Sequence, residues 1–111
     1  MTLQHIALES DWQAAQSAGS YPVSTRGRTI AEEGFMHCSG SPEQLQGVLG
    51  RFYADVTEPL LLLTIDEASL DRHGLDVRYE PAVLGGDELF PHVYGGDLPV
   101  GCVSQVGALR L

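Results

Sequence analysis

Two short segments of the sequence each place a histidine two residues before a hydroxyl side chain. The first, residues 34–39 (GFMHCS), contains His37 and Ser39, and the second, residues 90–95 (FPHVYG), contains His92 and Tyr94. Residues two apart along a β-strand point to the same face, so each segment predicts an imidazole beside a hydroxyl group. This pattern is typical of a polar cleft, although a histidine that is hydrogen-bonded beneath a helix cap would give the same pattern.

Three further residues could take part in chemistry at such a cleft. His5 lies in an apolar stretch near the N-terminus, where a lone strand histidine is more often structural or exposed than functional. Arg78 and Glu80 share one face of another predicted strand, and a plain salt bridge is the usual outcome for such a pair. Alternatively, Glu80 orients or activates a sugar hydroxyl and Arg78 holds a phosphate.

Other kinds of site find little support in the sequence. No pair of histidines or cysteines has the spacing of a zinc finger or of the H-E-x-x-H motif, so we assign no metal ligands and expect no structural zinc, while a loosely assembled catalytic metal stays an open alternative. No segment matches a Gly-rich phosphate loop or a G-x-S-x-G nucleophile elbow. Cys38 and Cys102 have apolar neighbours and form no C-x-x-C pair, so we expect free thiols in the core.

Two main helices are expected to position these segments. The first begins at a Ser10 cap and ends at Gly19. The second begins at a Ser41 cap, with Pro42 in its first turn and Gln44 closing a capping box. Its inward face should consist of apolar residues at helical spacing, namely Leu45, Val48, Leu49 and Phe52. A single helical turn is also expected within the polar connection, at residues 29–33.

Strands are expected over residues 3–8, 35–38, 60–65, 75–80, 90–94 and 100–106. The apolar run at residues 60–65 predicts a central strand that is buried on both faces. Pro91 predicts an edge strand because it lacks a backbone donor, and Gly101 marks a bulge in the last strand. Residues 81–89 form a loop. Because most strands follow one another without a crossover helix, we predict an α+β fold with a mixed, mostly antiparallel sheet.

The composition limits the classes of partner. The chain has 111 residues, which fits a single domain over residues 1–111, and it carries a net charge of −9 with no lysine. Nucleic acids and anionic membranes are bound largely through clustered cations, and the few arginines here are scattered, so neither partner is expected. A few arginines in a cleft could still hold a small anionic ligand. No signal peptide or membrane-spanning segment is evident, which favours the cytoplasm.

These segments together resemble a known family over nearly the whole chain. The resemblance is carried by His5, the Trp12 helix, residues 33–39 (EGFMHCS), the strand that ends at residues 65–66, residues 78–80 (RYE) and residues 90–95. They look like the bacterial domain of unknown function 952. The fold of that family is thought similar to the ADP-ribosyltransferase superfamily, which includes the RNA 2′-phosphotransferases, so the resemblance implies an ADP-ribosyltransferase-like fold.

The resemblance also implies roles for particular residues. Residues 36–39 are similar to the second motif of those enzymes, His5 falls where their first motif lies, and residues 90–94 fall near the third. By this similarity, His5 and Ser39 would hold the ribose of NAD, and Glu80 is the nearest candidate for the catalytic glutamate. The residues expected to bind the ligand are His5, Ser39, Arg78 and Tyr94, and those expected in catalysis are His37, His92 and Glu80.

Three interpretations follow from the sequence. The first is an ADP-ribosyltransferase-like enzyme that acts on NAD or a nucleotide-like small molecule, because transfer through an oxocarbenium-like state needs oriented hydroxyl contacts and a carboxylate. The second is a non-catalytic small-ligand-binding module on the same fold, which the uncertain place of the glutamate favours. The third gives the histidines purely structural roles. No particular cofactor is predicted, NAD is a possible substrate, and the oligomeric state is left open.

Overall fold

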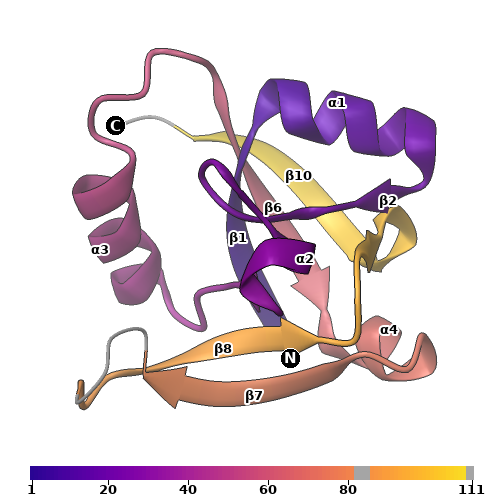
Figure 1. Ribbon diagram of the computed structural model, residues 1–111. Coiled ribbons are helices and arrows are strands. Elements are labelled where there is room, and N and C mark those ends of the chain that lie inside the picture. The colour runs from indigo at the N-terminus through magenta and orange to yellow at the C-terminus, as the bar shows by residue number, and fades with distance from the viewer. Residues whose placement is uncertain (82–85, 110–111) are drawn as a thin grey trace.

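Two three-stranded antiparallel sheets form the frame of the protein (Figure 1). The computed structural model describes residues 1–81 and 86–109, so residues 82–85 of the predicted loop lie outside it. The first sheet has the order β1 (Thr2–Leu8), β6 (Leu60–Asp66), β10 (Val103–Leu109), and the second has the order β5 (Met36–His37), β8 (Leu89–Tyr94), β7 (Asp76–Pro81). A backbone bridge between Gln4 and Ser39 joins the two sheets. The predicted α+β class and antiparallel pairing are confirmed.

Two main helices accompany the sheets, as the sequence predicts: α1 (Glu9–Ala18) and α3 (Pro42–Phe52). The shorter helices are α2 (Ile30–Glu33) and α4 (Glu67–Arg72), and residues Val100–Cys102 form a 3-10 turn. Short strand pairs connect these parts: β2 (Ser20–Tyr21) with β9 (Leu98–Pro99), and β3 (Val23–Thr25) with β4 (Arg28–Thr29). No described helix is long and apolar enough to cross a membrane.

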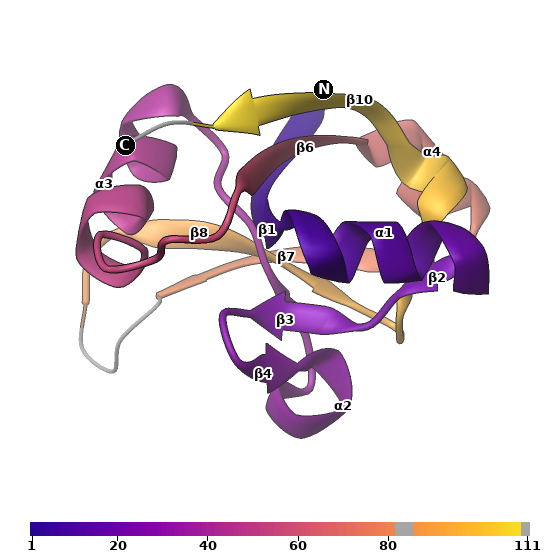
Figure 2. The same cartoon turned by 90° about the horizontal axis from the view of Figure 1, so that it is seen from above.

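Strand β6 lies at the centre of the first sheet and is covered on both faces, as its apolar run predicts. Its residues Leu63 and Ile65 are fully buried in the cluster that contains Trp12 of α1. Leu60 instead packs in the cluster formed with Leu49 of α3. Figure 2 shows α1 and α3 on either side of β1 and β6. The alternation of side chains along β6 therefore explains how one strand contributes to two apolar clusters.

Helix α1 does not begin as the sequence predicts. Its first residue is Glu9, the capping position is Leu8, and no side chain caps the helix. The Ser10 hydroxyl donates instead to Glu58. Strand β1 runs directly into the helix, and the Glu9 amide is satisfied by the carbonyl of Pro59 at 3.0 Å, so no side-chain cap is needed at this end. The predicted stop is confirmed, because Gly19 has a left-handed φ of 91°.

Helix α3 begins where the sequence predicts, with the Ser41 side chain accepting from the Gln44 amide and with Pro42 in the first turn. The Gln44 side chain, however, does not complete the capping box. It accepts from the Gly40 amide and donates to the carbonyl of Leu89, which ties the helix to the second sheet. The predicted burial of Phe52 is also wrong, because this side chain is 57% exposed. The short helix α2 is capped by Thr29 and confirms the predicted helical turn.

Strand β8 lies at the centre of the second sheet, so the prediction of an edge strand from Pro91 is wrong. The missing donor of Pro91 faces the end of β5, where the Cys38 amide donates to the Pro91 carbonyl at 3.1 Å. Because the paired residues of β5 end at His37, only one backbone bond is lost there. Pro91 thus lies just beyond the paired residues of β5, where β8 has a free edge on that side, and proline is tolerated at such an edge.

The last strand begins later than the sequence predicts. Residues Val100–Cys102 form the 3-10 turn that buries Cys102, so Gly101 lies before the strand rather than in a bulge. The register of β10 on β6 shifts between Val103 and Gln105, which places the irregularity inside the strand. Cys38 and Cys102 are both free and buried, as predicted.

Candidate functional site

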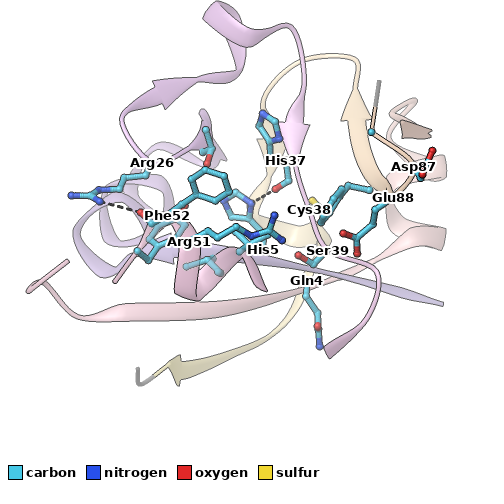
Figure 3. A pocket seen from close by; sticks show the side chains of 16 residues that line it. Gln4, His5, Arg26, His37, Cys38, Ser39, Arg51, Phe52, Asp87 and Glu88 are labelled. Carbon is cyan, nitrogen blue, oxygen red and sulfur yellow. Dashed lines mark hydrogen bonds between the residues drawn. The ribbon is translucent and has the colours of Figure 1, made fainter. Parts of the chain in front are cut away.

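A pocket of about 440 Å³ opens between the two sheets, on the side covered by α3 (Figure 3). Its walls come from β1, the β3–β4 turn, β5, the C-terminal part of α3 and the residues that enter β8. The lining residues are Gln4, His5, Ile6, Thr25, Arg26, His37, Cys38, Ser39, Val48, Arg51, Phe52, Tyr53, Gly86, Asp87, Glu88 and Phe90. The pocket thus combines apolar and aromatic surface with a small number of charged groups.

Of the residues expected in a cleft, His5, His37 and Ser39 line this pocket. The remaining ones do not line it and lie instead on the polar face of the second sheet: Arg78, Glu80, His92 and Tyr94. The structure therefore brings His5 and Ser39 together in this pocket and leaves His92 outside it. The physical reason is that Phe35 stacks against the His92 ring at a centroid distance of 4.2 Å and covers it.

The His5 imidazole is held by two hydrogen bonds inside the protein. Its Nδ1 donates to the carbonyl of His37 at 2.6 Å, and its Nε2 accepts from the Tyr21 hydroxyl at 2.9 Å. Burial lowers the pKa of His5 to about 4, so the ring is neutral at neutral pH, as this pairing requires. Because both nitrogens are used, His5 fixes the backbone at His37 and offers no unused ring nitrogen to a ligand.

His37 forms the boundary between the pocket and the polar face of the second sheet. Its side chain is 31% exposed, and its Nε2 lies 3.6 Å from a carboxylate oxygen of Glu33. The ring also contacts Phe35 and His92, with centroid distances of 4.8 and 5.1 Å. Burial, with a smaller effect from His92, lowers the pKa of His37. A neutral imidazole with an exposed edge can donate or accept a hydrogen bond or a proton from a ligand.

Ser39 combines a fixed backbone with an unused hydroxyl. Its amide and carbonyl exchange hydrogen bonds with Gln4 at 2.7 and 2.9 Å. The residue is only 3% exposed, yet its hydroxyl forms no hydrogen bond with any described residue. The neighbouring Cys38 is a less useful group, because burial raises the pKa of its thiol and keeps it protonated. The Ser39 hydroxyl is therefore the group best placed to bind a polar ligand atom.

Glu80, His92 and Tyr94 form a hydrogen-bonded cluster beside the pocket. One carboxylate oxygen of Glu80 accepts from His92 Nδ1 at 2.9 Å and from the Tyr94 hydroxyl at 2.5 Å. The hydrogen bonds from Tyr94 and His92 lower the pKa of Glu80, so the carboxylate is ionised at neutral pH. His92 is 2% exposed, and its Nε2 has no partner among the described residues. This cluster holds His92 in one orientation against the His37 ring.

Arg78 is not paired with Glu80, in contrast to the salt bridge that the sequence favours. Its Nε donates to Asp76 at 3.0 Å, and its guanidinium carbon lies 4.3 Å from the centre of the Tyr94 ring. Asp76 pairs with Tyr94 across the strands, so Arg78 contacts both residues at once. Glu80 is left to accept from His92 and Tyr94. Arg78 is thus engaged outside the pocket.

Charged residues that the sequence did not single out form two walls of the pocket. In Figure 3, Arg26 lies on one side and Asp87 and Glu88 lie on the other, while Arg51 extends from the Arg26 side toward the middle. Arg26 is held by Asp55 at 2.6 Å and by the carbonyl of Phe52 at 3.0 Å. No local motif marks these residues. They come from three separate segments, the turn that follows β3, helix α3 and the residues before β8, and they meet only in the folded protein. The pocket is therefore cationic on one side and anionic on the other.

Comparisons with known proteins agree with the resemblance of the sequence. A family model described as "Protein of unknown function (DUF952)" matches residues 6–106. The crystal structure of protein CC0527 from Caulobacter crescentus is similar, with 28% identity and a TM-score of 0.78 over 100% of this chain and 88% of that chain. The solution NMR structure of the same protein gives 26% identity and a TM-score of 0.75 over 99% and 85% of the two chains. No curated protein matches the sequence significantly.

Proposed function

The chain belongs to the DUF952 family of proteins of unknown function, and from this starting point we propose that its pocket binds a nucleotide-like small molecule such as NAD. The family description names no reaction, so the proposal depends on the chemistry of the pocket. A volume of about 440 Å³ falls in the range of small-molecule sites, which are mostly apolar with a few well-placed polar groups.

The walls of the pocket match the parts of a nucleotide. Phe52 lines the pocket and is 57% exposed, so it supplies aromatic surface on which a base could stack, while Phe90 is a buried part of the wall. The Ser39 hydroxyl and the exposed edge of His37 suit the hydroxyl groups of a ribose. The arginine side of the pocket suits the negative charge of a nucleotide.

The proposal depends most on one feature, the unused Ser39 hydroxyl beside the exposed edge of His37. Both residues belong to the segment that resembles the second motif of the ADP-ribosyltransferases, and His5, at the place of the first motif, fixes the same backbone through its bond to the His37 carbonyl. This arrangement supports an ADP-ribosyltransferase-like fold with its ligand between the two sheets.

ADP-ribosyl transfer is the second candidate function, and the carboxylates of Asp87 and Glu88 in the pocket wall favour it. In this reaction the bond between the ribose C1′ and the nicotinamide nitrogen breaks, and its electron pair leaves with nicotinamide. C1′ then bonds to an acceptor oxygen, which loses its proton. A nearby carboxylate stabilises the oxocarbenium-like state. Glu80 lies outside the pocket, so we assign it and His92 the role of positioning His37.

The charge of the protein and the pairing of its arginines indicate which class of ligand it binds. With a net charge of −9 and with Arg26, Arg28, Arg72 and Arg78 already paired with carboxylates, the chain is suited to a small molecule rather than to nucleic acid or an anionic membrane. We therefore place its activity on a soluble metabolite in the cytoplasm.

Binding is tested by thermal unfolding with NAD, ADP-ribose and adenosine. A ligand at 100 times its dissociation constant stabilises the folded state by about 2.7 kcal/mol, which raises the melting temperature of a domain of this size by roughly 10 °C. We expect NAD or ADP-ribose to give such a saturable rise, and the Ser39→Ala variant to lose it. The absence of any rise with all three compounds would refute nucleotide binding. If NAD binds, release of nicotinamide from NAD over hours would distinguish the transferase from the binding module.

A further inference from the structure

We propose that the Arg51 guanidinium is the anion-binding group of the pocket and that it takes a phosphate or diphosphate of the ligand. The inference rests on the proposed nucleotide-like ligand and names the residue that would select the charged part of it. Arg51 lies in the last turn of α3 and lines the pocket. No motif in the sequence distinguishes it from the other arginines.

The described arginines differ in whether a carboxylate pairs with them. Arg26, Arg28, Arg72 and Arg78 each have a carboxylate within salt-bridge distance. Arg51 has none among residues 1–81 and 86–109, although the protein carries 15 acidic residues and only 6 cationic ones. Arg51 is therefore a described arginine whose charge is not already engaged by a carboxylate of these residues. Arg51 is an exposed residue, and its side chain lines the pocket.

The Arg51 side chain is held against its own helix. Its Nε donates to the carbonyl of Gly47, one helical turn earlier, at 3.2 Å. One terminal nitrogen lies so close to the helix that a Cβ atom at position 47 would be 3.0 Å away. Gly47 therefore provides the space in which the guanidinium lies against α3. With Nε bound to the helix, the two terminal nitrogens remain for a ligand.

The guanidinium of Arg51 matches the geometry of a phosphate group. A guanidinium presents paired donors in a plane and binds phosphate or carboxylate oxygens through two parallel hydrogen bonds. Arg26 lies on the same side of the pocket, but both of its terminal nitrogens already donate to Asp55 or to the Phe52 carbonyl. The acidic side chains of Asp87 and Glu88 lie on the other side in Figure 3. An anionic group is therefore drawn to Arg51, and the hydroxyl groups of the ligand are drawn toward the acidic side.

The test compares two probes and two variants by calorimetric titration. The probes are inorganic diphosphate, which carries only the anionic group, and NAD, which carries the same group within a dinucleotide. The variants are Arg51→Gln and the control Arg72→Gln, whose arginine pairs with Asp66 and does not line the pocket. We expect Arg51→Gln to weaken the binding of both probes by about 10- to 100-fold, the usual effect of losing a charged hydrogen bond. Arg72→Gln should leave both affinities within about twofold.

The outcomes separate this inference from the proposed function. If NAD binds the wild type and Arg51→Gln equally well, the role of Arg51 is refuted while nucleotide binding stands. If diphosphate binds in an Arg51-dependent way and NAD does not bind, the anion site stands and the nucleotide-like ligand is refuted. If neither probe binds the wild type, both are refuted. Far-ultraviolet circular dichroism of each variant checks that a lost affinity does not come from a lost fold.

Discussion

Replacing Gly47 with alanine is expected to stabilise the protein and to weaken its ligand binding in the same variant. Gly47 lies inside α3 and has no positive φ, so alanine fits its backbone conformation. Glycine is less favourable than alanine in a helix interior by about 1 kcal/mol. The added Cβ would lie 3.0 Å from a terminal nitrogen of Arg51, which is too close. A flexible guanidinium can move away at little cost, so the variant should gain stability.

The same movement would displace the Arg51 guanidinium from the position in which it faces the ligand. We expect Gly47→Ala to raise the melting temperature by about 4 °C and to lower the affinity for NAD by roughly 3- to 10-fold, the effect of one weakened charged contact. Differential scanning calorimetry and calorimetric titration measure the two effects on the same sample. A structural role for Arg51 predicts the rise in stability without the loss of affinity.

Gly50→Ala is the matched control for this experiment. Gly50 belongs to the same helix, and a Cβ atom added there meets no atom within 4 Å. It should stabilise α3 by a similar amount and leave NAD affinity unchanged. Equal affinities of the two alanine variants, or a loss of stability in Gly47→Ala, would refute the positioning of Arg51 by Gly47.

Three other predictions follow from the site. Ser39→Ala should change the free energy of unfolding in urea by less than about 0.5 kcal/mol. The control Ser24→Ala removes a hydrogen bond to the Phe35 carbonyl and should lower the free energy of unfolding by about 1–3 kcal/mol. Equal losses in the two variants would contradict an unused Ser39 hydroxyl. His37→Ala should keep a melting temperature near that of the wild type, because the His5 bond is to the His37 backbone, and should lose NAD binding; a large melting loss with binding retained would make His37 structural. His5 has a pKa of about 4 in the folded protein and about 6.5 in the unfolded chain, so the unfolded state binds the proton more tightly. Stability should therefore be full above pH 6.5 and fall by about 3 kcal/mol toward pH 4, and His5→Gln should flatten this dependence; an unchanged slope in that variant would refute it.

Features that depend on neighbouring residues could be predicted from the sequence. Gly19 ends α1 in a left-handed conformation, and Ser41 with Pro42 begins α3, because such signals act within one turn of the backbone. The apolar run of β6 likewise predicted a central strand, since its alternating side chains must be buried on both faces. His37 and Ser39 were placed together because the alternation of a strand is local.

Features that depend on distant segments could not be predicted in this way. Pro91 lies in a central strand because its missing donor meets the end of β5, and Ser10 is not a cap because Pro59 satisfies the first helical amide. Phe52 follows the helical spacing of a core residue, but the pocket lies where its partner would be. The place of Arg51 in the pocket could not be predicted either, because the other walls of the pocket come from β1 and from residues that precede β8.

The most direct test of the account is a nitrogen–proton NMR titration of the protein with NAD. The account predicts saturable shifts at Ser39, at the Arg51 side-chain Nε and at Asp87, which lie on different walls of the pocket. Residues of β10, none of which lines the pocket, should keep their positions throughout the titration. Shifts that fail to saturate, or that centre on β10 while the pocket residues stay unchanged, would contradict the claim that this pocket binds a nucleotide.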